Sequence, residues 1–353
     1  MSTESLFKPF QYKNLELKNR IVMAPMTRAQ SDNGVPTQQI VDYYARRAAS
    51  EVGLILSEGT VIHRPGSKNL QNIPDFYGTE ALNGWKNVID AVHKNGGKMG
   101  PQIWHVGDTR MAEDYPLVDM EKASTMTLED IQDTIAQFAA SAKSAKDLGF
   151  DVLEIHGAHG YLIDQFFWEV TNTRTDEYGG KTLKERSKFA VDVVKAMRAA
   201  VGEGFTIIIR LSQWKQQDYK SRLALNPNEM EDWLLPLKEA GVDIFHCSQR
   251  RFWEPEFEGS DLNFAGWAKK LTGQPTITVG SVGLNGDFMA AFAGEGSEKA
   301  DLKELVRRLD REDFDLVAVG RALLSDYQWA KKIKDGRVEE LTDFAGSSLG
   351  VLY

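Results

Sequence analysis

The sequence predicts an α/β protein folded as a single (β/α)₈ barrel. Short apolar, β-branched runs alternate with longer segments of helical period, which is typical of repeated βα units. Eight such units fit a closed barrel better than an open doubly wound sheet, which usually has five or six strands. No G-x-G-x-x-G motif follows an early strand, so a Rossmann domain is not supported. The expected strands are Ile21–Ala24, Val52–Leu56, Met99–Trp104, Val152–Ile155, Thr206–Leu211, Ile244–Cys247, Thr276–Val279 and Leu316–Val319.

Two further elements carry clear local signals. Phe7–Leu17 alternates in polarity around a Lys-Asn pair, which predicts a β-hairpin that closes the lower mouth of the barrel. In Leu128–Leu148 apolar residues recur every three or four positions, as on one face of a helix. Thr127, with an aspartate three residues on, begins a capping box, and Gly149 suits the C-terminal cap of the same helix.

Two connections are long enough to cover an active site. Gly107–Ala123 follows the third expected strand and Gln249–Asn263 follows the sixth. Because the loops after barrel strands line the active site, both are candidate lids. The second loop mixes cations and aromatics; it either binds substrate or NAD(P)H phosphates, or is a solvated lid paired with its own acids. No repeat or linker interrupts the pattern, so residues 1–353 are expected to form one domain.

Composition narrows the class of protein. The formal net charge is −9 and the basic residues are scattered, so a nucleic-acid surface is not expected. No apolar run approaches the ~20 residues that span a bilayer, and the first residues lack the features of a signal peptide. With Cys247 alone there is no internal disulfide, Cys-rich zinc site or iron–sulfur cluster. A cytoplasmic enzyme of small metabolites is the expectation.

The most informative segment follows the fourth strand. His156 and His159 lie three residues apart on a Gly-rich turn, and Tyr161 comes two residues later. Two imidazoles directed at one carbonyl or enolate oxygen stabilise negative charge there, and a phenol supplies a proton to a neighbouring atom. A metal site or structural histidines are the alternatives. A metal needs further ligands, and His105 after the third strand is joined by no acidic cluster in the sequence.

A phosphate site is predicted after the last two strands. Gly280 and Ser281 follow the seventh strand, and Gly320 and Arg321 follow the eighth. Barrels often bind phosphate with these two loops, where backbone N–H groups and a short helix face the anion. Glycine permits close approach and arginine adds a fixed charge. These motifs alone fit many phosphate-binding barrels.

Taken together, the motifs resemble the Old Yellow Enzyme family of FMN-dependent oxidoreductases. The resemblance spans the chain in order, at the strand ends. It rests on residues 17–28, 102–105, 156–166 and 171–180, on Arg210, and on the closing Val-Gly-Arg at 319–321.

The resemblance implies which residues bind FMN. Pro25, Met26 and Thr27 would lie against the isoalloxazine, with the Thr27 hydroxyl at its O4 edge. Gly59 would let the backbone approach the ring. Gln102 would bind the pyrimidine edge, and Arg210 would place a cation by N1 and C2=O, where reduced flavin is negative. A salt bridge at the barrel rim is the alternative for Arg210.

The implied reaction is a ping-pong reduction of activated C=C bonds. NAD(P)H reduces the flavin and leaves, and an α,β-unsaturated carbonyl, a nitroalkene or a similar electrophile then takes its place. The acceptor oxygen would bind His156 and His159, hydride would reach the β-carbon, and Tyr161 would protonate the α-carbon. Trp104 is either a core aromatic or, beside Gln102 at a strand end, a wall of the pocket.

The chain departs from the family pattern at Phe167–Glu169 and Ser212–Gln216. Both segments are expected near the mouth of the site or at a subunit contact, so substrate size and a possible homo-oligomer stay open. Two rivals remain. One is a flavin-free phosphate-binding isomerase or aldolase, although no lysine is evident at a strand end to form a Schiff base. The other is a non-catalytic flavin carrier, against which the His-His-Tyr set argues.

Overall fold

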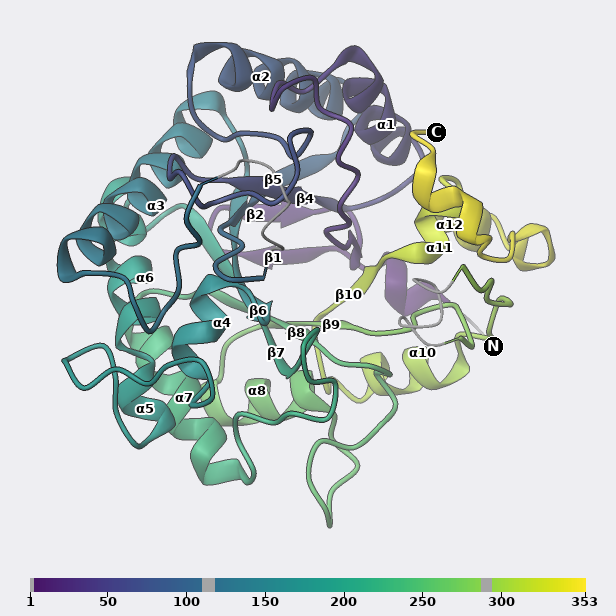
Figure 1. Cartoon of the computed structure of the whole chain (residues 1–353). Helices are drawn as coiled ribbons and strands as arrows, with labels where there is room; N and C mark the ends of the chain where they lie inside the picture. Colours follow the sequence, from purple (N-terminus) through teal and green to yellow (C-terminus); the bar gives the residue numbers. More distant parts are fainter. Residues whose placement is uncertain (1–2, 110–117, 287–293) are drawn as a thin grey trace.

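The chain forms a closed barrel of eight parallel strands, as the sequence predicted. The computed structural model describes residues 3–109, 118–286 and 294–353. The barrel closes in the order β10-β3-β4-β5-β6-β7-β8-β9, with β10 paired to β3. Figure 1 looks into this ring of strands. Its strands are β3 (Ile21–Met23), β4 (Leu54–Val61), β5 (Lys98–Trp104), β6 (Val152–His159), β7 (Thr206–Lys215), β8 (Ile244–Ser248), β9 (Thr276–Val279) and β10 (Leu316–Val319).

Helices surround the barrel (Figure 1), and their apolar faces are buried against the outward-facing strand residues. The long helix α3 has the predicted capping box between Thr127 and Asp130 and a left-handed Gly149 at its end. Among the described residues, no helix has both the length and the apolar composition needed to cross a bilayer. The helices are α1 (Gln38–Ala49), α2 (Thr79–Lys94), α3 (Leu128–Leu148), α4 (Leu162–Phe167), α5 (Leu183–Arg186), α6 (Lys188–Val201), α7 (Pro227–Ala240), α8 (Phe264–Thr272), α10 (Lys303–Asp310), α11 (Arg321–Ser325) and α12 (Trp329–Lys334). Short 3₁₀ turns cover Glu4–Phe7, Val338–Glu340 and Gly346–Gly350.

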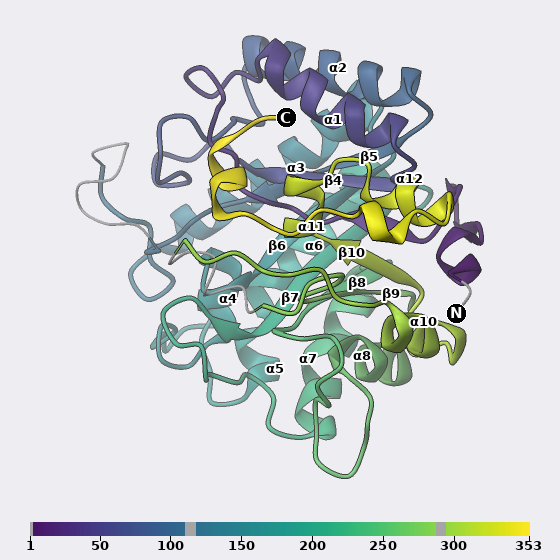
Figure 2. The same cartoon turned by 90° about the vertical axis from the view of Figure 1, so that its right-hand side faces the viewer.

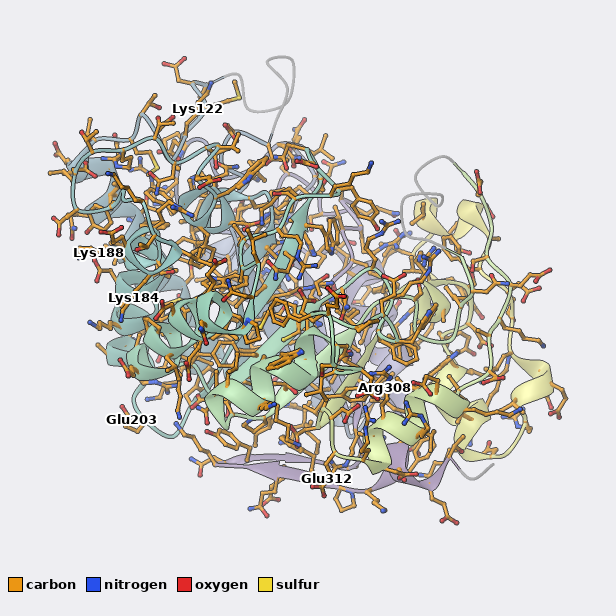
Figure 3. All side chains as sticks on the ribbon, turned by 90° about the horizontal axis from the view of Figure 1, so that it is seen from below. Lys122, Lys184, Lys188, Glu203, Arg308 and Glu312 are labelled. Carbon is orange, nitrogen blue, oxygen red and sulfur yellow. The ribbon has the colours of Figure 1, made fainter. Side chains whose placement is uncertain are left out.

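The predicted N-terminal hairpin closes one end of the barrel. Strands β1 (Phe10–Tyr12) and β2 (Leu15–Leu17) pair antiparallel. Phe10 and Leu17 are buried against the apolar residues that point into the barrel. Seen from below, the hairpin lies near the labelled Glu203 and Glu312, at the end opposite Lys122 (Figure 3). The hairpin therefore seals the amino ends of the strands and leaves the carboxyl ends open for a site.

Strands β6 and β7 run further than the sequence suggested. The prediction ended β7 at Leu211, four residues short of its end at Lys215, and β6 continues to His159. The two strands stay paired up to His159 and Lys215, with a register shift after Gly157. All of β7 is buried, although its last residues are polar in sequence. This paired extension carries the histidine segment above the barrel rim.

Candidate active site

Two adjoining hollows lie at the carboxyl ends of the strands. Their empty volumes, which include open solvent, are about 650 and about 1110 Å³. Every residue that the sequence analysis assigned to the site lines at least one of them. Pro25, Met26, His159, Arg210 and Arg321 line both hollows. Gly280, Ser281 and Gly320 line the smaller one, and Thr27, Gly59, Gln102, Trp104, His156 and Tyr161 line the larger one.

The two histidines face the larger hollow side by side. Their ring centroids are 5.2 Å apart, and both side chains are buried. Burial, and then the nearby Arg210 guanidinium, hold the pKa values of His156 and His159 well below 6.5. Both imidazoles are therefore neutral near pH 7, so each has one N–H to donate. The Nδ1 atom of His156 is buried without a hydrogen-bond partner.

The backbone at His159 is in a left-handed conformation, with φ of +64°. Non-glycine residues seldom adopt it. The backbone N–H of His159 donates to Ser212 Oγ at 2.9 Å, and its Nε2 lies 2.8 Å from Ser248 Oγ. The ring stacks on Trp214 at 4.4 Å between centroids. Contacts from β7 and β8 thus hold this ring.

The tyrosine completes the cluster that the sequence predicted. Tyr161 lies 5.0 Å from His156 and meets Trp104 edge-on at 4.7 Å, both measured between ring centroids. Burial raises the pKa of Tyr161, while a hydrogen bond from the Gln216 side chain lowers it. The phenol is therefore protonated at neutral pH, as a proton donor must be.

The metal alternative finds no support in the described part of the chain. No group of three His, Cys, Asp or Glu side chains there could hold an ion. His105 does have an acidic neighbour that the sequence reading missed, because its Nε2 lies 2.7 Å from Glu121 Oε2. The other ring nitrogen of His105 accepts the Gly107 N–H at 3.0 Å, so this histidine has a structural role.

Arg210 on β7 lies opposite His156 on β6 in the strand register, and it is buried. Its Nη1 donates to the Pro25 carbonyl at 3.5 Å, and its Nε has no hydrogen-bond partner. Burial lowers the pKa of Arg210, and the charge of Glu154 raises it. The rim salt bridge is not seen, since no carboxylate of the described residues lies within 4.0 Å of this guanidinium. Arg210 is thus a buried cation facing the cavity.

A buried polar network lies one layer deeper in the barrel. Gln102 donates through Nε2 to Glu154 Oε1 at 2.8 Å, and His246 Nδ1 lies 2.6 Å from Glu154 Oε2. Sequence reasoning missed Glu154 and His246, because inward-facing polar residues in barrel strands give no local signal. The network fixes the Gln102 amide, which leaves its carbonyl oxygen and one N–H for the cavity.

Gly59 is needed for a reason that the sequence did not reveal. A Cβ atom at this position would lie 2.4 Å from Cε3 of Trp104. Trp104 thus packs flat over the Gly59 backbone and forms a wall of the larger hollow. The pocket-wall interpretation of Trp104 agrees with this placement.

The smaller hollow gathers the predicted phosphate residues. Gly280 has φ of +143°, and a Cβ there would meet the Gln249 carbonyl at 2.2 Å, so only glycine fits. Arg321 Nη2 donates to Ser281 Oγ at 3.4 Å and to the Gly286 carbonyl at 2.8 Å. Arg250, in the loop for which the sequence left ligand binding or a solvated lid open, also lines this hollow and stacks over Tyr219 at 4.1 Å. Three arginines therefore face one cavity of an acidic protein.

The candidate lids differ in outcome. Residues 110–117 of the third-strand loop lie outside the described residues. In the loop after β8, Arg251 Nη1 pairs with Glu254 at 3.2 Å, as the solvated-lid interpretation expects. Arg250 instead turns into the smaller hollow.

The statement that no lysine stands at a strand end is wrong. Lys215 ends β7 and is fully buried, because the strand continues beyond its apparent polar end. Its Nζ donates to Asp164 Oδ1 at 2.7 Å, to the Gln213 carbonyl at 3.1 Å and to the Ser212 carbonyl at 3.4 Å. All three ammonium donors are used, so this lysine is not poised for Schiff-base chemistry.

The fold and the cavity define a (β/α)₈ barrel with a small-molecule site at the carboxyl ends of its strands. Comparison with known proteins identifies which kind. Residues 5–340 match the NADH:flavin oxidoreductase / NADH oxidase family. The NADH oxidase of Thermoanaerobacter brockii is 32% identical over 369 residues, which cover 99% of this chain and 53% of that protein. The chain thus spans about half the length of that relative.

Solved structures agree. Morphinone reductase is 26% identical, with a TM-score of 0.78 over 98% of this chain and 92% of that one. An Old Yellow Enzyme homologue from Zymomonas mobilis is 23% identical and has the same fold, with a TM-score of 0.79 over 98% and 96% of the chains. This chain belongs to the NADH:flavin oxidoreductase / NADH oxidase family, which confirms its resemblance to Old Yellow Enzyme. FMN is the cofactor of this family and NAD(P)H is the reductant.

Proposed function

We propose that this protein is an FMN-dependent ene-reductase that reduces activated C=C bonds with NAD(P)H. The observation that carries the proposal is the convergence of His156, His159 and Tyr161 on one hollow beside Arg210. Two neutral N–H donors and a protonated phenol are the groups needed to polarise an unsaturated carbonyl and to protonate it. The substrates are α,β-unsaturated carbonyls, nitroalkenes and related electrophiles.

The residues present fit FMN. The Nε atom of Arg210 is buried without a partner, as expected of a cation that awaits the electron-rich edge of a ring system. Gln102 offers an amide to the pyrimidine edge. Pro25, Met26 and Thr27 supply a wall, and Pro25 and Met26 also line the phosphate end. Ser281, Arg321 and the backbone around Gly280 and Gly320 would hold the phosphate. When bound, FMN supplies the two-electron carrier between NAD(P)H and the acceptor.

The chain's own residues account for the rest of the reaction. His156 and His159 donate hydrogen bonds to the acceptor oxygen, which draws electron density from the C=C bond and makes the β-carbon electrophilic. Tyr161 gives its proton to the α-carbon. Trp104 excludes water from one side of the larger hollow.

The reductant and the acceptor use the larger hollow in turn, which gives ping-pong kinetics. One hollow holds both histidines and the phenol, so a nicotinamide and an enone compete for it. Morphinone reductase has been solved in complex with tetrahydroNAD, which supports a nicotinamide reductant here.

The test uses the purified holoprotein, its His156→Ala and His159→Ala variants, and a phenol. A phenolate should bind the histidine pair and give a long-wavelength charge-transfer band with the flavin. Each variant should weaken that complex by about 1.5–3 kcal/mol, the value of a hydrogen bond to a charged group. Unchanged phenol affinity in both variants refutes the assignment. A colourless protein that FMN cannot reconstitute favours the phosphate-binding rival, and failure to oxidise NAD(P)H with cyclohexenone favours the flavin carrier.

A further inference from the structure

The segment Ser212–Gln216, which the sequence analysis expects to depart from the family pattern, holds the last four residues of β7 and the residue after it. It lies directly beside the turn formed by His159, Gly160 and Tyr161, because β6 and β7 pair up to His159 and Lys215. The turn has two successive left-handed residues, His159 at φ +64° and Gly160 at φ +85°. A histidine in this conformation must be held by its surroundings.

Two residues of the segment hold His159 directly. Ser212 Oγ accepts the backbone N–H of His159 at 2.9 Å and donates to the Trp214 carbonyl at 2.7 Å. The Trp214 ring stacks on the imidazole with an interplanar angle of 28°. The backbone and the ring of His159 are both fixed from β7.

A buried ion pair holds the next residue of the turn. Lys215 Nζ donates to Asp164 Oδ1 at 2.7 Å, and both side chains have 0% exposure. The other oxygen, Asp164 Oδ2, accepts the Gly160 N–H at 2.7 Å. The ion pair thus connects the end of β7 to the backbone between His159 and Tyr161.

We infer that Lys215 and Asp164, with Ser212 and Trp214, form a positioning device that sets the orientation of His159 and Tyr161. The inference rests on the proposed function. A fully buried ion pair is an expensive way to stabilise a fold, since well-packed apolar residues often do as well or better. Here the pair fixes the direction of the turn, because the Asp164 carboxylate binds the Lys215 ammonium and the Gly160 N–H at the same time. Lys215 is a positioning residue and touches no substrate.

The experiment compares two double variants of the holoprotein. Lys215→Met with Asp164→Asn removes both charges together, so no uncompensated charge is left buried. The control is Arg198→Met with Asp243→Asn, a buried ion pair at the hairpin end of the barrel. Both variants should lower Tm.

Only the first double variant should affect chemistry at the turn. Oxidation of its reduced flavin by cyclohexenone should slow by about 10- to 100-fold, because moving a reacting group by about 1 Å lowers the rate by such a factor. Its phenol Kd should rise, while reduction by NADPH stays within about twofold of wild type. The control should retain both half-reactions and the phenol Kd.

The outcomes separate the two proposals. If the Lys215→Met/Asp164→Asn variant folds and keeps the wild-type rate of oxidation by cyclohexenone and the wild-type phenol Kd, the positioning role is overturned. The proposed function is unaffected by that result. An equal loss in both half-reactions also overturns it. A wild-type protein that neither binds phenol nor reduces cyclohexenone overturns the proposed function, and this inference with it. If the double variant does not fold, Ser212→Ala should show the same selective loss at a smaller size, and no loss there overturns the inference.

Discussion

At the scale of single residues, the site keeps buried polar atoms without partners. The Nδ1 of His156 and the Nε of Arg210 are both in this state. Each such atom costs about 1–3 kcal/mol in a folded protein, and a ligand that forms hydrogen bonds with both atoms would offset this cost. Tyr161 lies at the same place, with its hydroxyl protonated and its ring held by Trp104.

Tyr161→Phe tests the proton donor. Reduction of the flavin by NAD(P)H needs no protein proton and should stay nearly intact. Oxidation by an enone should slow by roughly 10²–10⁴-fold, the range for a positioned general acid. The rate of nitroalkene reduction should fall less, because a nitronate is stable enough to form without concurrent protonation. Stopped-flow measurement of the separate half-reactions decides. Similar modest losses in both would mean that the phenol only packs against its neighbours.

At the scale of elements, the sequence predicted where each strand begins better than where it ends. Apolar β-branched runs marked all eight barrel strands. The sequence predicts a loop for the last residues of β7, because Ser212, Gln213 and Lys215 are polar. In the structure all three are buried. Their polar groups bond to partners in β6, in α4 and in the loops around Ala224 and Glu256, which no local pattern shows.

The same limit applies to the site. The histidines, Tyr161 and the predicted phosphate loops carry motifs, and the structure brings them to two adjoining hollows. Lys215 forms an ion pair with Asp164, and His246 forms a hydrogen bond with Glu154; both pairs join distant segments. Such pairs are visible only after the strands are placed side by side.

The loops after β9 and β10 lead to a prediction about the cofactor. Arg321→Met should weaken FMN binding to the apoprotein by roughly 10- to 100-fold, the loss of one hydrogen bond to a charged group. Arg307→Met on the exposed face of α10 is the matched control, since Arg307 pairs only with its helix neighbour Glu304. Titration of FMN fluorescence gives both Kd values. Equal Kd values for the two variants would remove Arg321 from the phosphate site.

At the scale of the whole molecule, three distant parts of the chain meet at Glu58 and Arg28. Glu58 on β4 accepts backbone N–H groups of Arg28 and Ala29 at 2.8 and 2.9 Å. Arg28 Nη2 donates to the Ser348 and Val351 carbonyls at 3.3 Å. The C-terminal segment therefore lies along the molecule beside α1 (Figure 2). The first loop of the barrel is held by both β4 and the chain's end.

Burial raises the pKa of Glu58 to about 7. The folded state thus keeps this proton where the unfolded state, with a pKa near 4.5, has lost it. Stability from this group is present below pH 4.5 and is lost as pH rises to 7. Glu58→Gln removes this titrating group. Between pH 4.5 and 8 the free energy of unfolding of the variant should therefore rise relative to wild type by up to about 3 kcal/mol. Urea unfolding of both proteins at pH 4.5 and pH 8 measures the difference in their free energies of unfolding. The same difference at both pH values would contradict the prediction.

The seam between β10 and β3 sets an order of events during synthesis. Arg20 Nη1 donates across it to the Asp315 carbonyl, 295 positions along the chain. Pro25, Met26 and Thr27 leave the ribosome early, whereas Gly320 and Arg321 leave near the end, and the two groups meet only when the last strand docks. Until then β3 and β9 are open edges that invite pairing with other chains. The proposed FMN site includes both groups, so capture of FMN would follow closure, and the yellow colour of a newly made molecule would mark a finished barrel.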